Sequence, residues 1–585
     1  MIERKDIEDF FDKEAEAARE RWEAMMKLEV KDRIRKRRAI KDLYLDRDFQ
    51  KQSDDGYVLL KVKVGVNLAD FKEGECLILH HEGSNLGIEC TLNSFEGDDA
   101  IILEVFPPNM PSSLDSYYDK PLLLDKDIVD LRQYVYYPFV WDLPEKNDEF
   151  WETMLLNAKP KPTFEDRDKN AEEVDDTAKN FKLNLLTKQR EAIINSMSAK
   201  DYYLIQGPPG TGKSYVLGII ILEEMLYFKH KVIIIGPNHM AINNALGQAL
   251  KVCPFFPNFI KVGQSYNAPT IKINIDDKEV CIKNINRLYD STYKINNFEH
   301  PWVIGLTPHS LYTSRGRGLE CDTLIIDEAG QMTIPLALMG MIKAKKVIFA
   351  GDHKQLPPIV SSDEVKDEMK QSAFQALMTE NNCTMLDVSF RMCEPICDFV
   401  SALFYDGKVK PMKQGCGDLI VCDEPLYDFH TPIIIHNVDD DGEQTSDKEA
   451  EFIADTIAGF LKKGLPANEI AVLSPFRAQA ANVRRHIRKH KDISEEQRKH
   501  IASDTIDKMQ GQEREVIIYS LVSGNLDYMT EMAEFLYNPN KMNVAFSRAK
   551  SKLIIVGNVE QIKNISTIEY PHMEKMFESD LAHFV

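Results

Sequence analysis

The sequence predicts a multidomain α/β protein in which two consecutive α/β domains follow an N-terminal helix and a small β-barrel. Three observations predict this fold class. Apolar residues near the N-terminus recur at helical spacing, the next region has short strands of period two, and the remainder shows two series of β-rich runs alternating with helical patterns. At 585 residues the chain is long enough for about three to five domains of ordinary size.

The first third of the chain divides into a helix, a barrel and a linker. Residues 1–45 are expected to form one long helix, because apolar residues lie three or four apart on a single stripe. Residues 46–145 contain short apolar runs separated by glycine and acidic turns, which indicates a small antiparallel β-barrel. Residues 146–182 have little to bury and are expected to be a linker. The apolar stripe consists of Ile7, Phe11, Ala15, Ala18, Trp22 and Met25.

Two α/β domains are expected over residues 183–385 and 386–585. In each, short β-rich runs alternate with helical patterns, which is typical of a parallel sheet with helices on both faces. Residues 265–300 are rich in Asn, Asp and Lys and lack this alternation, so they are expected to be an insertion in the first domain.

The composition excludes several classes of protein. The 72 basic and 93 acidic side chains give a net charge of -21, so any nucleic-acid partner must bind a local groove rather than a uniformly basic surface. No apolar run approaches the roughly 18 residues of a membrane helix, and the N-terminus is too charged for a signal peptide. We therefore expect a soluble, cytoplasmic monomer. Ten cysteines without a CxxC pair predict reduced thiols rather than a disulfide framework.

The stretch GPPGTGKS at residues 207–214 fits the phosphate-binding pattern G-x-x-x-x-G-K-[ST], between a strand pattern and a helical pattern. Its glycines allow backbone N–H groups to surround phosphate oxygens. Lys213 is expected to reach the β and γ phosphates of ATP, and Ser214 to ligate Mg²⁺. The residues expected around the nucleotide are Gly207, Pro208, Pro209, Gly210, Thr211, Gly212, Lys213, Ser214 and Tyr215.

Two carboxylates follow the apolar run TLII. Asp327 and Glu328 come at the C-terminal tip of an expected strand, where ligands bind in open α/β sheets. Asp327 is expected to hold Mg²⁺, and Glu328 to orient and deprotonate the attacking water. An isolated pair could equally cap a helix, but the phosphate loop favours the catalytic interpretation. Gln189 lies 18 residues before Gly207, where its amide could pair with both edges of adenine.

The stretch FAGDHKQLPPIV, residues 349–360, ends the next expected strand. Gln355 is interpreted as a sensor that hydrogen-bonds the γ phosphate or the attacking water. Pro357 and Pro358 prevent an immediate helix and stiffen the loop, so that a shift at Gln355 is transmitted rather than absorbed. His353 is interpreted as a loop cap. The alternative is an ordinary polar loop before a helix.

Six stretches occur in an order and spacing that resemble superfamily 1 helicases of subgroup B, most of all the nonsense-mediated-decay and immunoglobulin-switch-binding helicases. They are GPPGTGKS, DEAGQ, GDHKQLPP, SFRMCEPICDFVSALFYDGKV, SDTIDKMQGQEREVII and NVAFSRAKSKLIIVGN. The resemblance covers about residues 181–560. By pattern, the preceding helix and barrel also resemble that group's accessory stalk and barrel.

The resemblance implies that ATP lies between two RecA-like domains and that the second domain completes the site. Arg391 and Arg548 are then arginine fingers, which stabilise charge on the transferring phosphoryl group and typically contribute about 10³ to 10⁵ in rate. Phe390 would stack on adenine, Gly511 would approach the γ phosphate, and Glu513 would bind the ribose. Because the fingers come from the other domain, hydrolysis requires closure.

The resemblance also implies a single strand of RNA or DNA as the partner. Four residues in loops across the domain tops are expected to contact sugar and phosphate, although each could instead form a turn or a cap. The basic runs at 31–41 and 484–491 could add phosphate contacts or be solvated helix faces. The four candidates are Asn238, Thr307, Arg477 and Thr505.

The motifs leave more than one functional hypothesis. The leading hypothesis is an ATP-driven helicase or translocase that moves 5′ to 3′ along a single strand. A nucleic-acid-gated ATPase clamp that does not unwind duplexes would carry the same motifs. The second α/β series and the Arg548 motif argue against a AAA+ protein unfoldase. Cys393 and Cys397 lie one helical turn apart, but a metal site is rejected because the family has a helix start there.

Overall fold

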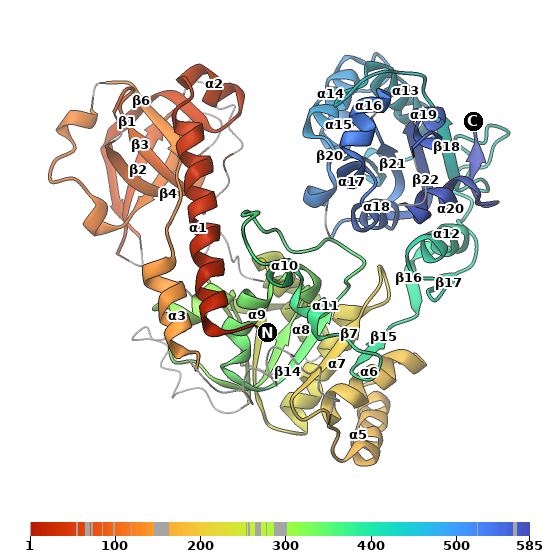
Figure 1. Ribbon diagram of the computed structural model, residues 1–585, viewed down its shortest axis with the longest axis horizontal. Helices are drawn as coiled ribbons and strands as arrows, with labels where there is room; N and C mark the ends of the chain where they lie inside the picture. The colour runs from red at the N-terminus through yellow and green to blue at the C-terminus, as the bar shows by residue number, and fades with distance from the viewer. Residues whose placement is uncertain are drawn as a thin grey trace.

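A computed structural model describes residues 2–585 except 54–55, 65–70, 72–73, 85, 97–99, 119, 145–162, 253, 255–257, 264–270, 276–277, 286–300, 510, 523 and 566–569. Figure 1 shows a barrel and two α/β domains, with helix α1 running from the barrel to the first α/β domain. The chain passes from the first to the second α/β domain between strands β15 (Cys383–Met385) and β16 (Val388–Cys393). None of the helices in these described ranges is both long and apolar enough to cross a bilayer.

The N-terminal segment forms two helices, not the single helix expected to residue 45. Helix α1 spans Arg4–Met26, α2 spans Val30–Arg35, and strand β1 begins at Ala39. Arg37 has a positive φ of 57°, which ends the helical path. Arg33 is buried, with its Nε 3.3 Å from Oδ1 of Asp125 in the barrel. Arg33, one residue of the basic run 31–41, therefore packs against the barrel and is not part of a solvated helix face.

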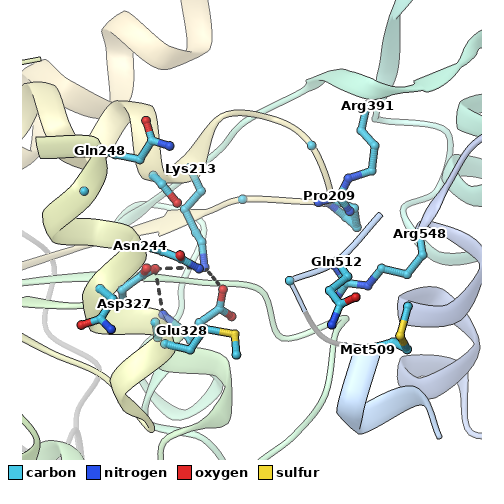
Figure 2. A pocket seen from close by; sticks show the side chains of 18 of the residues that line it. Pro209, Lys213, Asn244, Gln248, Asp327, Glu328, Arg391, Met509, Gln512 and Arg548 are labelled. Atoms are coloured by element: carbon cyan, nitrogen blue, oxygen red, sulfur yellow. Dashed lines mark hydrogen bonds and ion pairs between the residues drawn. The ribbon is translucent and has the colours of Figure 1, made fainter. Parts of the chain in front are cut away.

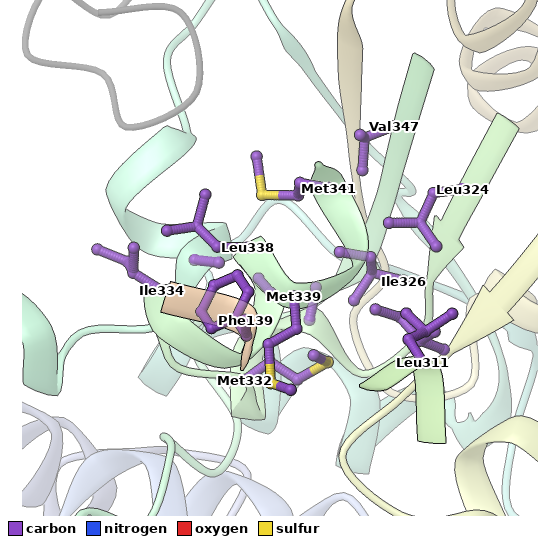
Figure 3. Close-up of a cluster of buried hydrophobic side chains, with 14 of the residues drawn as sticks. Phe139, Leu311, Leu324, Ile326, Met332, Ile334, Leu338, Met339, Met341 and Val347 are labelled. Carbon is purple, nitrogen blue, oxygen red and sulfur yellow. The ribbon is translucent and has the colours of Figure 1, made fainter. Parts of the chain in front are cut away.

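The N-terminal half of α1 packs on the first α/β domain. Ile7, Phe10 and Phe11 are buried, and the Phe11 ring stacks on Tyr136 with 4.0 Å between ring centroids. Phe139, from helix α3 (Tyr137–Asp142), lies among apolar side chains of the first α/β domain such as Met332, Ile334 and Leu338 (Figure 3). The helices next to the barrel therefore share the hydrophobic core of the first α/β domain.

Helix α1 also contacts the segment that follows the Gln355 loop. Oε1 of Glu14 accepts hydrogen bonds from the backbone N–H groups of Ser361 and Ser362, at 2.7 Å each. Nζ of Lys13 donates to the carbonyl of Glu364 at 2.8 Å. These contacts attach residues 361–364 to the helix that leads to the barrel.

The predicted small antiparallel β-barrel is confirmed. Six strands close in the order β1-β2-β5-β4-β3-β6, with antiparallel pairing throughout. Alternate side chains such as Leu60, Val62, Leu77 and Leu79 fill its interior. The strands are β1 (Ala39–Gln52), β2 (Val58–Lys63), β3 (Cys76–His80), β4 (Gly87–Glu96), β5 (Ala100–Val105) and β6 (Leu122–Lys126).

Part of the expected linker is a helix. Residues Arg167–Asn180 form α5, which packs on α6 (Thr187–Ser198). Val174 and Asn170 are buried, and Nδ2 of Asn170 donates to Oγ of Ser198 at 3.0 Å. The buried side chain of Val174 and the Asn170–Ser198 hydrogen bond hold this polar helix against α6. A single apolar residue in a polar segment is too little for the composition to predict a packed helix. The rest of the linker lies mostly outside the described residues.

The first α/β domain contains a sheet in the order β10-β11-β9-β12-β8-β13-β14-β7-β15. All neighbouring strands are parallel except β10 and β11. Strands β7, β14 and β13 lie side by side, so the loops that follow them meet at one edge of the sheet. The strands are β7 (Tyr202–Gln206), β8 (Lys231–Ile235), β9 (Phe259–Val262), β10 (Ile271–Ile275), β11 (Lys278–Ile285), β12 (Trp302–Gly305), β13 (Cys321–Ile326) and β14 (Ala344–Gly351).

Helices cover this sheet, and the expected insertion extends it. The described part of residues 265–300 is the β10–β11 hairpin, in which β11 pairs in parallel with β9. The remainder of the insertion lies outside the described residues. The remaining helices are α7 (Lys213–Leu226), α8 (His239–Val252), α9 (Ile334–Met341), α10 (Asp367–Lys370) and α11 (Ala373–Leu377).

The second α/β domain has a parallel sheet in the order β20-β19-β21-β22-β18-β23 and a separate parallel pair, β16 and β17 (Lys410–Lys413). The sheet strands are β18 (Ile433–Asn437), β19 (Ile470–Ser474), β20 (Ala502–Thr505), β21 (Arg514–Ser520), β22 (Ala549–Gly557) and β23 (His583–Phe584). The helices are α12 (Glu394–Phe404), α13 (Asp447–Lys462), α14 (Arg477–Lys489), α15 (Glu495–His500), α16 (Leu526–Glu531), α17 (Ala533–Leu536), α18 (Pro539–Phe546), α19 (Val559–Lys563) and α20 (Pro571–Phe577).

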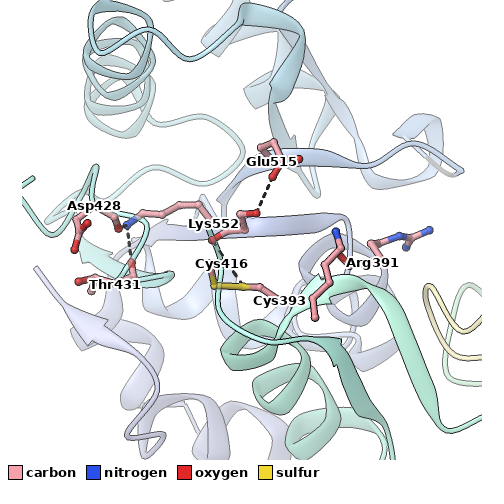
Figure 4. Close-up of a disulfide and its surroundings, with 9 residues drawn as sticks. Arg391, Cys393, Cys416, Asp428, Thr431, Glu515 and Lys552 are labelled. Atoms are coloured by element: carbon pink, nitrogen blue, oxygen red, sulfur yellow. Dashed lines mark hydrogen bonds between the residues drawn. A yellow bond between two sulfur atoms is a disulfide. The ribbon is translucent and has the colours of Figure 1, made fainter. Parts of the chain in front are cut away.

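Cys393 and Cys416 form a disulfide, so the expectation that the thiols are reduced is wrong for this pair (Figure 4). Cys393 ends β16 and Cys416 follows β17, and the pairing of these strands brings the two sulfur atoms together. No motif marks this pair, whose members lie 23 residues apart in the sequence. Cys397, the other half of the pair considered for a metal, is a free buried thiol.

Candidate functional site

A cleft of about 1590 Å³ lies between the two α/β domains. The first domain contributes the phosphate loop, Asp327, Glu328 and Gln355, and the second contributes Arg391 and Arg548. Figure 2 shows Lys213 and the carboxylates on one wall and the arginines on the other. Other predicted residues that line the cleft are Gly207, Pro208, Pro209, Gly210, Thr211, Gly212, Ser214, Tyr215, Asn238, Arg477 and Gly511.

The phosphate loop has the backbone that its glycines allow. Strand β7 ends at Gln206, and helix α7 begins at Lys213. Gly210 and Gly212 have φ values of 75° and 83°, in the left-handed region that glycine adopts without strain. The loop therefore curves ahead of the helix N-terminus, where backbone N–H groups and the helix dipole favour an anion.

Strand β16 of the second domain lies directly against this loop. The backbone N–H of Phe390 donates to the carbonyl of Gly210 at 2.8 Å, and Oγ of Ser389 donates to the carbonyl of Pro209 at 2.9 Å. A Cβ atom at Gly210 would lie 2.5 Å from Cβ of Arg391. A side chain at this position would therefore push away the strand that carries Arg391.

Lys213 bridges the two carboxylates. Its Nζ lies 3.0 Å from Oδ1 of Asp327 and donates to Oε1 of Glu328 at 2.7 Å. Burial raises the pKa of Asp327. Burial also opposes ionisation of Glu328 and of Lys213, but electrostatic attraction outweighs it. Lys213 lowers the pKa of Glu328, and Asp327 together with Glu328 raises the pKa of Lys213. Glu328 is therefore ionised, and its backbone is held at a left-handed φ of 54°.

Gln355 lies at the edge of the cleft, in the loop after β14. Its Nε2 donates to Oδ2 of Asp352 at 2.9 Å, which fixes the amide near the position expected of a sensor. The ring of His353 stacks on Phe374, with 6.3 Å between centroids. Of the side chains in this loop, that of Gln355 is the one that lines the cleft.

The two arginines differ in their surroundings. Nε of Arg391 lies 2.6 Å from Oε2 of Glu513, and its Nη1 donates to the carbonyl of Ser547 at 3.2 Å. The Arg548 side chain is buried, and among the described residues its Nε has no hydrogen-bond partner. Burial, and then repulsion by Arg391, lower the pKa of Arg548 to about 9. A buried cation with an unused donor at this cleft is suited to bind an anion.

Three predicted nucleotide contacts are not among the lining residues: Gln189, Phe390 and Glu513. In this structure both ends of the Gln189 amide bond to backbone groups. Nε2 donates to the carbonyl of Thr211 at 3.1 Å, and Oε1 accepts from the N–H of Leu186 at 3.2 Å. Gln189 thus supports the phosphate loop. Glu513 is engaged by Arg391, and Phe390 is 41% exposed.

Two of the four nucleic-acid candidates line the cleft between the domains. Asn238 and Arg477 line the cleft, whereas Thr307 and Thr505 do not. Oδ1 of Asn238 accepts from the N–H of Ala241 at the start of α8, and the Thr307 hydroxyl lies 2.9 Å from Oγ of Ser310. Thr505 is buried. Asn238 and Thr307 thus make the bonds of local caps, and Asn238 and Arg477 are the two exposed candidates that line the cleft.

One face of α8 was missed in the sequence. Asn244, Gln248 and Lys251 line the cleft beside the hairpin residues 271–274. These side chains lie three or four positions apart on a helix that otherwise buries Ala and Leu. The polar side chains at helical spacing could have been noticed in the sequence. Their position in the cleft, however, depends on the residues that face them, which the sequence alone does not identify.

Comparison with known proteins agrees with this architecture. Two family models, each described as an AAA domain, match residues 184–298 with 303–363 and residues 369–560. The chain is 28% identical over 442 residues to DNA polymerase alpha-associated DNA helicase A of Schizosaccharomyces pombe, covering 66% of this chain and 65% of that protein. It is 27% identical over 497 residues to an ATP-dependent helicase of Methanocaldococcus jannaschii, covering 68% and 72%.

A third relative is DNA replication ATP-dependent helicase/nuclease DNA2 of Mus musculus, 26% identical over 446 residues, covering 69% of this chain and 39% of that protein. Together, the two family models and these relatives support a superfamily 1 helicase. The chain spans less than two thirds of the length of the first and third relatives. Its two α/β domains are the RecA-like pair expected of such helicases, with the phosphate loop in the first and both arginines in the second.

Proposed function

We propose that this chain is an ATP-dependent helicase or translocase, which hydrolyses ATP between its RecA-like domains and moves 5′ to 3′ along single-stranded RNA or DNA. One observation carries the proposal. Lys213, Asp327 and Glu328 form one wall of a cleft whose other wall holds Arg391 and Arg548. A triphosphate in this cleft would lie between cations from both domains, so hydrolysis depends on their approach.

The first domain supplies the groups for binding and water activation. Backbone N–H groups of the phosphate loop and Nζ of Lys213 would hold the phosphates, which draws Lys213 away from the carboxylates. Hydroxyl and carboxylate oxygens suit Mg²⁺, so Ser214 and Asp327 would hold it, and when bound it neutralises charge on the β and γ phosphates. Glu328, released from Lys213, would accept the proton of the attacking water.

The second domain supplies positive charge in the transition state. The guanidinium of Arg548 has an unused Nε donor and would bond the transferring phosphoryl group. Arg391 is paired with Glu513 in this structure, so it would exchange Glu513 for phosphate when the cleft closes. Glu513 would then be available for the ribose. Coupling of closure to hydrolysis supplies the conformational step for strand movement.

ATP turnover measured with and without single-stranded RNA and DNA tests the proposal, together with strand separation on duplexes with 5′ or 3′ overhangs. Stimulated turnover and unwinding of the 5′-overhang substrate are expected, and Lys213→Ala should abolish both. The absence of ATP hydrolysis in the unmodified chain would overturn the proposal. Stimulated turnover without unwinding of either substrate would favour the nucleic-acid-gated clamp.

A further inference from the structure

A hydrogen-bonded junction joins the sensor loop of the first RecA-like domain to the second domain. Its centre is the buried carboxylate of Asp352, directly after β14. Oδ2 of Asp352 accepts from Nε2 of Gln355 at 2.9 Å and from the hydroxyl of Tyr405 at 2.6 Å. Oδ1 accepts from Nε2 of Gln206, the residue before the phosphate loop, at 3.1 Å. One carboxylate thus contacts the phosphate-loop strand, the sensor and the other domain.

Tyr405 continues the junction into the second domain. It caps helix α12, is 3% exposed, and its hydroxyl accepts from Nδ2 of Asn543 at 2.7 Å. Burial, and then the charge of Asp352, raise the pKa of Tyr405 well above its ordinary value. The hydroxyl therefore keeps its proton, and it donates to Asp352 while accepting from Asn543.

The junction ends on the helix that precedes Arg548. Nδ2 of Asn543 also donates to the carbonyl of Lys354 at 2.6 Å, and Nδ2 of Asn540 donates to the carbonyls of His353 and Gln355. Asn540 and Asn543 lie three positions apart in α18, so both face the sensor loop. Helix α18 ends at Phe546, two residues before Arg548. Figure 1 shows α12 and α18 on the side of the second domain that faces the first.

We propose that Tyr405 is a positioning residue, which sets the position of Arg548 according to whether Gln355 is bonded to Asp352 or to the nucleotide. Gln355 and the Tyr405 hydroxyl share one oxygen of Asp352. When Gln355 turns toward the γ phosphate or the attacking water, Asp352 loses one donor and the Tyr405 bond strengthens. That bond draws α12 and α18 toward the first domain. This inference rests on the proposed ATPase function of the cleft.

The test is Tyr405→Phe, which removes only the hydroxyl. Tyr519→Phe is the matched control, because Tyr519 is fully buried in the same domain and, among the described residues, its hydroxyl has no hydrogen-bond partner. For Tyr405→Phe we expect kcat of nucleic-acid-stimulated ATP turnover to fall about tenfold while the KM for ATP stays within about twofold. Tyr519→Phe should leave both unchanged. A purely structural role would instead lower the unfolding midpoint without this split between kcat and KM.

A double-variant cycle keeps the proposal open to refutation if Tyr405→Phe is also less stable. If Tyr405 acts through the Gln355 junction, the double variant with Gln355→Ala should be about as slow as the slower single variant. Independent effects that multiply would overturn the proposal, as would equal kcat for Tyr405→Phe and Tyr519→Phe in a chain that hydrolyses ATP. The absence of hydrolysis in the unmodified chain would instead overturn the proposed function, and this inference with it.

Discussion

Replacing Arg548 by methionine should stabilise the nucleotide-free protein while it removes ATPase activity. The Arg548 side chain is 4% exposed, and among the described residues its Nε lacks a hydrogen-bond partner. Burial, and then repulsion by Arg391, lower its pKa from 12.5 to about 9. The guanidinium is still charged at pH 7, but a pKa difference of this size corresponds to an energetic cost on the order of 5 kcal/mol for the charged form.

Methionine occupies a comparable space without the charge. Replacement of a buried ion pair by apolar residues of similar volume is often stabilising, by about 1 to 4 kcal/mol, and removal of a buried cation whose Nε has no hydrogen-bond partner among the described residues should act in the same direction. A gain of about 2 kcal/mol would raise the unfolding midpoint of a domain of ordinary size by roughly 4 to 8 °C. With nucleotide bound, the unmodified chain should be more stable than Arg548→Met, because the phosphate provides the Arg548 Nε with a hydrogen-bond partner.

Thermal unfolding with and without a non-hydrolysable ATP analogue, combined with steady-state turnover, tests this reasoning. Arg391→Met is the matched control, because Arg391 already has an ion-pair partner in Glu513. Its replacement should slow hydrolysis without stabilising the nucleotide-free protein. A lower unfolding midpoint for Arg548→Met than for the unmodified chain, or turnover within tenfold of it, would refute the assignment of Arg548 as an unsatisfied cation that awaits phosphate.

Other predictions concern the base, a buried carboxyl and the strand. Glu328→Gln should abolish turnover but retain nucleotide, measured by equilibrium binding; normal hydrolysis would exclude Glu328 as the base. Burial raises the pKa of Glu449 to about 8, so native stability should fall as pH rises from about 5 to 8, and chemical denaturation of Glu449→Gln should not show this fall. Binding to a single strand should weaken with salt, with a log-log slope of about -0.7 per neutralised phosphate; salt-independent binding would contradict a phosphate-binding channel.

The sequence predicts those features that depend on contiguous residues or on regular periodicity. The phosphate loop, the carboxylate pair and the barrel each have a local pattern, and the structure gathers Lys213, Glu328 and Arg548 around one cleft. The pairing of Lys213 with both carboxylates follows from the adjacency of β7, β14 and β13, which no single motif encodes.

What the sequence did not reveal depends on tertiary contacts. The adenine contact of Gln189 stays a prediction, and the two backbone groups that its amide bonds in this structure are not evident from its distance to the phosphate loop. The Cys393–Cys416 disulfide depends on the pairing of β16 with β17. Tyr405 lies inside a stretch used for the family resemblance, yet the positioning role proposed for it depends on a hydrogen bond to Asp352, which is distant in sequence.

The attachment of α1 has a mechanical consequence. The N-terminal part of α1 is buried in the core of the first RecA-like domain, and the Glu14 carboxylate accepts hydrogen bonds from the backbone of Ser361 and Ser362. A helix of 23 residues is about 35 Å long. The barrel lies at one end of this helix, and the other end is fixed to the first domain next to the segment that follows the sensor loop. A force that tilts the barrel therefore acts on residues 361–364 through α1. Because these residues follow the Gln355 loop, a force on bound nucleic acid would be transmitted to the proposed site of ATP hydrolysis.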